Sequence, residues 1–516
     1  MVGGRRSLFR AGLLPATCLP AILLGGLTAP ALADDLREAL VAAYQTNPSL
    51  EAARANQRAV DAGVPIARAA GLPSLSNVTT FTEFLQKSPN AFTAPDRSLD
   101  IQANLSVPIY SGGAVRNSVQ AAETRVKAGR GDLRATESGL FSQVVGAYVD
   151  VIRDQAIVGL NRNNVQVLEV NLTATRDRFE IGDLTRTDVA QSQARLAQAH
   201  SDLRSAEATL AGSRESYIRL VGKPPVDLQP PPPLPGLPAT PDDAVETALD
   251  HNPDLVAARL RSKAAGFDTR VAGSNRLPRI SAFSGVDYTN FFSTLGGPAS
   301  ASVSQRQTTA QAGIRATIPL FQGGLPAAQE RQAQAREGAT LEQEIGTERE
   351  VIASVRTFFQ QWKAANEIIQ SSQSAVDAAA LGLEGVRAEN SVGNRTILDI
   401  LNAEQELLNT QVVLVRARRN AYVAGFSLLA AMGRAEARDL GLDGGILYDP
   451  DVNYRRVRGN VFDWASDPAP VVRSTRTVDT PAQDGSVSAK DTPMAVPEPG
   501  VAPASEPVPA VPKTGG

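Results

Sequence analysis

The sequence has few of the residues on which most catalytic and metal sites depend. Its 516 residues include one cysteine, Cys18, and only two histidines. It contains no glycine-rich phosphate loop followed by Lys-Ser/Thr, no CxxC pair and no HExxH motif. We therefore expect no enzyme: no catalytic residues, no bound cofactor and no metal site.

Other absences limit the class of protein further. The formal net charge of −3 argues against a nucleic-acid partner, because neutralising phosphates requires a basic surface. After the N-terminus no apolar run approaches the ~20 residues of a membrane-spanning helix. Aromatic residues make up only 5%, but 42% hydrophobic and 20% charged residues are ordinary for a folded chain.

The N-terminus is typical of an export signal. Three arginines within the first ten residues precede an apolar stretch, and Ala31-Leu32-Ala33 then offers the small-x-small pattern of signal-peptidase sites. The predicted signal peptide is 1–33, with cleavage between Ala33 and Asp34. The paired arginines leave both Sec and twin-arginine export open. Because Cys18 lies inside this segment, the mature chain should contain no thiol.

The rest of the chain contains an internal duplication. The motif Asn47-Pro48-x-Leu50 recurs 205 residues later as Asn252-Pro253-x-Leu255. Further along, Pro108-x-x-x-Gly112-Gly113 recurs 211 residues later as Pro319-x-x-x-Gly323-Gly324. The second offset persists for about a hundred residues, which indicates a tandem repeat of roughly two hundred residues.

The repeat defines the predicted domains. The two halves are 34–223 and 242–464, joined by a proline-rich connector at 224–241 that can be neither helix nor central strand. Residues 465–516 are rich in Pro, Ala, Ser, Thr and Val without periodicity, and we expect them to be a disordered tail.

Each half contains a long segment of alternating polarity. Apolar side chains occupy the odd positions of Ser98–Tyr110 and the even positions of Thr308–Leu320, with less regular partner strands near 74–86 and 279–293. Runs of about thirteen residues suit tilted membrane strands, which need ~9–11. A soluble sandwich is the alternative. Since the smallest membrane barrels have about eight strands, four per chain would require an oligomer.

Long helices are predicted to follow each strand pair. The corners between strand and helix should be formed by the repeated motif: Pro108, Gly112, Gly113, Pro319, Gly323 and Gly324. No proline occurs from Ala114 to Ile181, where apolar residues recur every seven positions: Val144, Val151, Val158, Val165, Leu172 and Phe179. Gly182 and Gly393 should end the long helices, and Thr185 and Thr396 should begin the next, forming two αα-hairpins.

These features resemble the TolC family of outer-membrane channel proteins over roughly 35–464. The most specific segments are Ser391–Ala403 (SVGNRTILDILNA) and Tyr448-Asp449-Pro450-x-x-Asn453-Tyr454. The resemblance implies a mostly α fold with membrane β: a homotrimer in which four strands per chain form a twelve-stranded barrel in outer-membrane lipid, continued by a periplasmic α-helical barrel. It also implies two partners, a periplasmic adaptor (membrane fusion protein) and an inner-membrane pump, either ABC-type or proton-driven.

The same resemblance suggests a gate at the hairpin ends. By position, Arg395 of one hairpin would link to Thr187 and Asp188 of another, and Asp399 would line the aperture. Gly182 and Gly393 would contact the adaptor. The sequence departs from the family at two positions, with Asn390 replacing a tyrosine and Asn402 replacing a second aspartate. A structural alternative is that Asp188 and Asp399 are helix-capping residues.

Several functional readings remain open at this point. Within the channel interpretation, type I protein secretion and small-molecule efflux both fit, with the hairpin motif and 448–464 favouring secretion. From other classes, a periplasmic coiled-coil scaffold and an adhesin with a helical stalk are the alternatives. The exported substrate is expected to be selected by the pump and adaptor.

Overall fold

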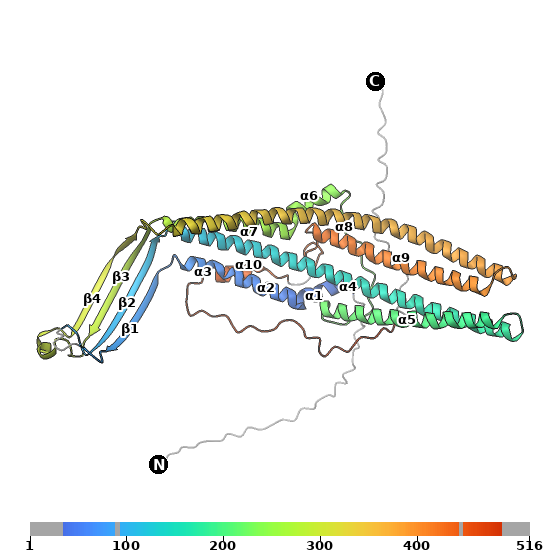
Figure 1. The fold of residues 1–516 in the computed structure, drawn as a ribbon, viewed down its shortest axis with the longest axis horizontal. Helices are drawn as coiled ribbons and strands as arrows, with labels where there is room; N and C mark the ends of the chain where they lie inside the picture. Colours follow the sequence, from blue (N-terminus) through green and yellow to red (C-terminus); the bar gives the residue numbers. More distant parts are fainter. Residues whose placement is uncertain (1–34, 88–92, 443–446, 488–516) are drawn as a thin grey trace, which may run out of the picture.

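The computed structural model describes residues 35–87, 93–442 and 447–487, and Figure 1 shows an elongated molecule with a sheet at one end. The predicted signal peptide, its cleavage site at Ala33 and Asp34, and residues 488–516 of the tail lie outside the described residues. The mostly helical fold with a four-stranded sheet agrees with the prediction.

The two repeats have matching elements. The first contains α1 (Leu36–Thr46), α2 (Pro48–Asp61), α3 (Gly63–Ala69), β1 (Ser74–Glu83), β2 (Arg97–Tyr110), α4 (Ala114–Glu180) and α5 (Arg186–Val221). The second contains α6 (Pro241–His251), α7 (Pro253–Gly273), β3 (Arg279–Asn290), β4 (Arg306–Thr317), α8 (Leu325–Ser391) and α9 (Ile397–Ala431), followed by α10 (Pro450–Val457). A short 3₁₀ segment, η1 (Ser274–Arg276), precedes β3, and a second, η2 (Gly297–Ser302), lies between β3 and β4.

The long helix α4 has the length that its sequence predicts. It contains 67 residues, or about 100 Å at ~1.5 Å per residue. The heptad positions Val144, Val151 and Val158 are completely buried. The last position, Phe179, is 43% exposed, because the seam ends before the hairpin tip.

The sheet has one apolar and one polar face. Its strand order is β1-β2-β3-β4, and every neighbouring pair is antiparallel. The register aligns Leu75 with Leu105 and Ala282 with Ile314, so apolar positions share a face across the strands. On the opposite face the Thr289 hydroxyl donates to Asp100 at 2.8 Å. None of the buried clusters among the described residues includes a strand residue, so no second sheet or helix covers the apolar face as a soluble sandwich requires.

Three of the strands are shorter than predicted. β4 ends at Thr317, before Pro319, because proline cannot donate to the ladder. β1 ends at Glu83 and β3 at Asn290. Pro108 does lie inside β2, where the register with β3 shifts between Pro108 and Tyr110.

The corners between strand and helix depend on glycine. Gly112, Gly113, Gly323 and Gly324 all have φ between +60° and +83°, which side chains rarely allow. A Cβ on Gly112 would also come within 2.8 Å of Leu277 Cβ, so the first corner packs closely on the segment before β3.

The main core lies midway along the helices, where α1, α4, α5 and α9 meet. Phe141, Tyr148 and Tyr217 are its largest completely buried side chains. The predicted connector, 224–241, contains neither helix nor strand through residue 240, but its last residue, Pro241, begins α6. It joins the halves through the hydroxyl of Tyr148, which donates to Gln229 O at 2.6 Å, and that of Tyr422, which donates to Pro232 O at 3.1 Å.

The predicted disorder of the tail is wrong for residues 466–487. This segment has no helix or strand, but its last residues, 483–487, make specific contacts with α4 and α5. Arg214 donates to Asp484 O at 2.7 Å, Gln483 N donates to Glu215 at 2.8 Å, and Val487 is buried in the main core. Backbone hydrogen bonds and one apolar anchor therefore hold a proline-rich segment that composition alone describes as unstructured.

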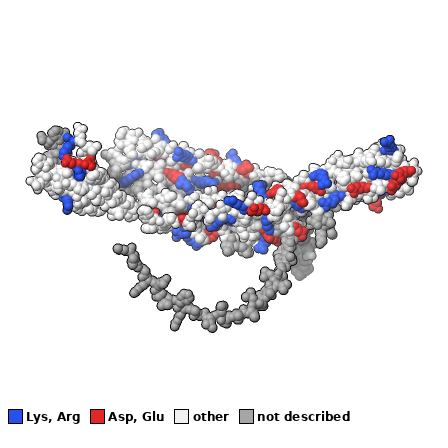
Figure 2. Space-filling view, turned by 90° about the horizontal axis from the view of Figure 1, so that it is seen from below, with Lys and Arg blue, Asp and Glu red and all other residues white. Residues whose placement is uncertain are grey.

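The helices carry charges of both signs. On the face shown in Figure 2, Lys and Arg alternate with Asp and Glu along the helices rather than forming a patch of one sign. Among the described residues, no helix combines the length and apolarity needed to cross a bilayer.

Candidate gate at the helical hairpin ends

The two hairpin tips are built in the same way. In each, a glycine with positive φ follows the long helix, Gly182 at +85° and Gly393 at +81°. A Cβ at either position would meet nothing within 4 Å, so both tips are open. A salt bridge spans each turn: Arg178 Nε donates to Asp183 at 2.7 Å, and Arg395 Nε donates to Glu389 at 2.6 Å.

Each hairpin's second helix begins with a capping box. The Thr185 backbone N–H donates to Asp188 at 2.9 Å, and Asp188 N donates to the Thr185 hydroxyl at 3.3 Å. Thr396 and Asp399 repeat this arrangement at 2.9 and 3.3 Å. Hydrogen bonds from the Thr185 side chain and backbone lower the pKa of Asp188. Those from Thr396, backbone first, lower the pKa of Asp399. The capping interpretation of both carboxylates is therefore confirmed.

Within the described chain, no hydrogen bond or salt bridge joins Arg395 to Thr187 or Asp188. Arg395 is paired with Glu389 of its own hairpin, and Asn390 Nδ2 donates to Arg395 O at 2.7 Å. The carboxylate of Asp188 accepts a hydrogen bond from the Thr185 hydroxyl, and Thr187 is exposed. A link from Arg395 to Thr187 and Asp188 therefore remains a prediction about neighbouring chains.

Another group of residues does join the two hairpins. Glu404 of α9 is 6% exposed and accepts hydrogen bonds from helices of both hairpins. Asn171 Nδ2 of α4 lies 2.8 and 2.9 Å from its two carboxylate oxygens, and Arg387 Nη2 of α8 lies 3.0 Å away. Two donors thus compensate the burial of this carboxylate. We call Asn171, Arg387 and Glu404 the Glu404 tie.

Apolar and polar contacts surround this tie. Leu401 is 2% exposed and packs with Val165, Leu168 and Ala199 of the first hairpin. Beside it, Arg195 of α5 donates to Asn402 Oδ1 at 2.8 Å. Asn402 thus retains a polar role between hairpins, although it lacks the charge that the family resemblance would place there.

The sequence reasoning missed the Glu404 tie. Its signal was a carboxylate within an apolar heptad: Ile397, Leu401, Glu404 and Leu408 alternate in steps of four and three residues. Burying a charge at such a position is costly unless a partner helix supplies hydrogen-bond donors. The pattern could have identified Glu404 but not Asn171, which lies 233 residues away.

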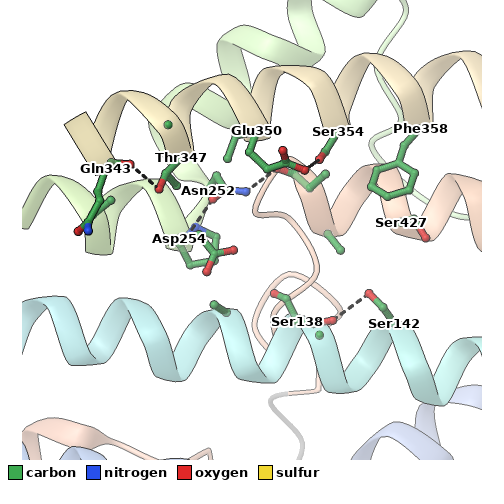
Figure 3. A pocket seen from close by; sticks show the side chains of 18 of the residues that line it. Ser138, Ser142, Asn252, Asp254, Gln343, Thr347, Glu350, Ser354, Phe358 and Ser427 are labelled. Carbon is green, nitrogen blue, oxygen red and sulfur yellow. Dashed lines mark hydrogen bonds between the residues drawn. The ribbon is translucent and has the colours of Figure 1, made fainter. Parts of the chain in front are cut away.

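A cavity lies nearer the middle of the helices, between α4, α7, α8 and α9 (Figure 3). It measures about 950 Å³ and is lined mainly by small and hydroxyl side chains, including Ser138, Ser142 and Thr347. At its wall Asn252 caps α7 by accepting from Asp254 N at 3.0 Å, and its amide donates to Ala431 O at 2.9 Å. Burial raises the pKa of Asp254.

Several serine and threonine hydroxyls line the cavity. Among the described residues that line it, there is no histidine or cysteine to activate a serine hydroxyl. Elsewhere in the described part of the chain, no three His, Cys, Asp or Glu residues are placed to hold a metal ion.

The chain is similar to known proteins over most of its length. The family model for outer membrane efflux proteins matches residues 39–223 and 244–434. Outer membrane efflux protein BepC of Brucella suis is 33% identical, covering 86% of this chain and 95% of that protein. Alkaline protease secretion protein AprF of Pseudomonas aeruginosa is 28% identical, covering 60% and 64%. The solved outer membrane protein VceC of Vibrio cholerae has a TM-score of 0.67 and 23% identity, covering 77% and 96%.

Proposed function

The chain belongs to the outer membrane efflux protein family, and from this premise we propose that three copies form one export duct through the outer membrane and periplasm. In this duct twelve strands close a barrel in lipid, and the long helices continue it as a tunnel. The duct performs no chemistry of its own, and a periplasmic adaptor and an inner-membrane pump supply the cargo and the energy.

The observation that carries this proposal is the sheet with two open edges. β1 and β4 are its outer strands, so each has one unpaired edge. Apolar side chains on these strands are strongly exposed, with Leu75 at 75% and Ile314 at 72%. An open apolar sheet of four strands is unstable alone, whereas closure with further copies removes both edges.

The internal duplication indicates how the copies meet. Gly112 packs on Leu277, but its repeat equivalent Gly323 has nothing within 4 Å of a Cβ. The equivalent of Leu277 is Leu72, which lies before β1 at the other edge of the chain. Repeating the internal contact between chains therefore places Leu72 of one copy on Gly323 of the next.

The same reasoning gives the strand register. Within the chain Leu105 of β2 pairs with Ser284 of β3. The repeat offsets of 211 and 205 convert these into Ala316 of β4 and Thr79 of β1. We expect Ala316 of one copy to lie opposite Thr79 of the next.

A cysteine pair tests this register. The variant Thr79→Cys/Ala316→Cys should form disulfides between subunits and migrate as a covalent trimer until it is reduced, because the mature chain has no other thiol. The control Thr79→Cys/Ala312→Cys keeps the same face but shifts one thiol four residues, ~13 Å along the strand. Equal crosslinking of both variants, or covalent dimers alone, would refute the arrangement.

We also propose a gate with two kinds of link. The Glu404 tie joins the hairpins within a chain, and Arg395 joins them between chains. The duplication supports the second link: the contact of α4 with α9 inside the chain corresponds to α8 with α5 of the next copy. That correspondence brings Arg395 toward Thr187 and Asp188 of the neighbour, while Asp399 remains near the aperture.

Single-channel recording in planar bilayers tests the gate. Arg395→Ala should raise conductance without loss of trimer, since it removes a contact that favours the closed state. Arg178→Ala is the matched control, because it breaks the corresponding turn salt bridge in the other hairpin. If both variants conduct like the parent, Arg395 serves only its own turn. Asp399→Ala should instead weaken cation preference.

Both cargo classes have support among the relatives. The similarity to BepC extends over almost the whole of that protein and favours an efflux role, while the similarity to AprF favours protein secretion. We place efflux first, because the longer and stronger match is to the efflux protein. Crosslinking at Gly182 and Gly393, the proposed adaptor contacts, would capture the partner that decides between them.

A further inference from the structure

A short loop after α10 has a defined shape and an exposed apolar tip. Residues 460–465, here called the aromatic loop, begin where the Asn460 side chain accepts from Phe462 N at 3.1 Å. A turn follows, in which Ala465 N donates to Phe462 O at 3.1 Å. Arg456 and Asp467 pair across the base, with Nη2 2.9 Å from Oδ2. The loop is therefore held at its base and at its turn.

The side chains at its tip are among the most exposed apolar groups in the described chain. Val461 is 68%, Phe462 67% and Trp464 86% exposed. Tryptophan is scarce in this protein, with two residues in total. The other, Trp362, packs against Phe359 with ring centroids 6.0 Å apart. A neighbouring Phe and Trp that both face outward on a fixed loop mark a contact surface rather than scattered exposure.

The loop lies close to the start of the membrane strands. Tyr454 of α10 packs on the small cluster of Val64 and Val126, which joins α3 to the N-terminal part of α4. Arg68 of α3 donates to Arg458 O at 2.8 Å, and β1 begins at Ser74, only six residues after Arg68. Figure 1 shows α10 beside α2 and α3, toward the end of the helices that carries the sheet.

Two arginines lie near the apolar tip, which itself contains one carboxylate, that of Asp463. Arg68 and Arg458 have no carboxylate partner within 4 Å in the described part of the chain, and Arg458 lies over the Tyr454 ring at 5.8 Å. Tryptophan prefers the interface between headgroups and acyl chains, and basic side chains are drawn to lipid phosphates. Aromatic and basic groups thus occur together at the level where the proposed barrel leaves the bilayer.

We propose that the aromatic loop rests on the periplasmic surface of the outer membrane, where Trp464 and Phe462 enter the lipid interface. Arg68 and Arg458 supply the charge attracted to the phosphates. The proposal rests on the proposed function, because a lipid surface is adjacent only if the sheet spans the bilayer. The position of the loop beside α3, which leads directly into β1, favours lipid over a second copy of the chain as the loop's partner.

Fluorescence of the full-length protein tests this directly. In Trp362→Phe, Trp464 is the single tryptophan, and the protein is incorporated into nanodiscs of phosphatidylglycerol and phosphatidylethanolamine. Lipids brominated near the carbonyl end of the acyl chains should reduce its emission by about twofold or more, whereas aqueous iodide should have little effect. The matched control Trp464→Phe retains Trp362, which lies 37 residues along α8 from Leu325, or about 55 Å, and should not respond to brominated lipid.

Each other outcome has a separate meaning. Strong iodide quenching of Trp464 would place the loop in water and overturn the proposal. Protection from both quenchers would show that protein covers Trp464 and would equally overturn it. Failure of the protein to co-elute with nanodiscs would instead contradict the proposed membrane function, so the two failures are distinguishable.

Discussion

The duplicated helices α4 and α8 have the same length but very different surroundings. Each contains 67 residues, yet 25 are buried in α4 and only 7 in α8. Shifted by 211 positions, all seven buried residues of α8 coincide with buried residues of α4. The α8 residues are Val351, Val355, Phe359, Ala365, Ile369, Ser372 and Leu383, and they match Leu140, Val144, Tyr148, Asp154, Val158, Asn161 and Leu172.

The difference lies in what flanks each helix. Both pack against the second helix of their own hairpin and against the helix that precedes their strand pair. In addition α4 contacts α7 and α9 of the other repeat. The equivalents of these elements for α8 would be α2 and α5, which lie on the far side of the chain. The exposed flank of α8 is therefore the surface on which the next copy should pack.

Replacing a central side chain in each helix should expose this asymmetry most strongly. Phe141 of α4 is completely buried, and its equivalent in α8, Ile352, is only partly buried. Phe141→Ala should lower the free energy of unfolding by about 3–5 kcal/mol, and Ile352→Ala by about 1 kcal/mol. Urea unfolding of protein dissociated into single chains in detergent measures both, because a neighbouring copy then cannot cover α8. Equal losses would show that α8 is as enclosed as α4.

Much of this architecture could be predicted because repetition and periodicity are local signals. The alternating polarity of 98–110 and the proline-free run from 114 established a strand and a long helix. The end of β4 could not be placed, since the apolar alternation continues past Thr317 through Ile318 and Leu320 although the ladder does not. Val487 joins the main core, and its carbonyl accepts a hydrogen bond from Arg162, 325 positions away, which composition cannot reveal.

The Glu404 tie sharpens the comparison at the hairpin ends. It joins α4 to α9, but the equivalent positions for α8 and α5 are Gly382 and Gln193, which cannot form a buried charged pair. Glu404→Ala should cost about 1–3 kcal/mol, because Asn171 loses its acceptor while Arg387 can still reach water. Urea unfolding gives the loss, and planar-bilayer recording should show longer open times. Gln193→Ala is the control and should change neither.

The site illustrates what a family resemblance can and cannot supply. It placed Asp188 and Asp399 at a gate, which stays a prediction, whereas their matched positions come from the internal duplication and the capping boxes follow from Thr-x-x-Asp alone. It could not reveal Glu404, because that residue's partners come from two other helices. Residues that join elements distant in the sequence are determined by packing, and a single sequence does not show which faces meet.

The caps provide a smaller and more symmetrical test. Thr185→Ala and Thr396→Ala each remove the hydroxyl that accepts from N3, so each should cost about 1 kcal/mol. Because both boxes have the same geometry, the two losses should agree even though the helices above them are buried so differently. Hydrogen exchange of the first turns of α5 and α9 measures the effect. A much greater loss at Thr396 would indicate that its cap also supports a further contact, such as the proposed link between chains.

The smallest expected effect is a pH dependence of stability that has opposite signs in the main core and at the hairpin tips. In the main core, burial raises the pKa of Glu137 above its ordinary 4.5, and burial also raises that of Glu436. Because their pKa is raised in the folded state, the two glutamates add most to the free energy of unfolding below pH ~4.5. This stabilisation is lost as the pH rises through their folded-state pKa. At the tips the pKa values of Asp188 and Asp399 are lowered, so their contribution is present above their ordinary 3.8 and is lost on acidification.

Hydrogen exchange can separate these opposing trends within one sample. Between pH 6 and pH 3, after correction for intrinsic exchange rates, the first turns of α5 and α9 should lose protection while the segment around Glu137 should gain it. Glu137→Gln should reduce the response of the core to the share that Glu436 contributes and leave the tips unchanged, because the glutamine amide does not titrate. Protection that fell in both regions would mean that acid acts on the assembly as a whole. Divergent protection, with only the core response reduced by Glu137→Gln, would show that acid destabilises the hairpin tips while the core that joins both hairpins keeps its protection.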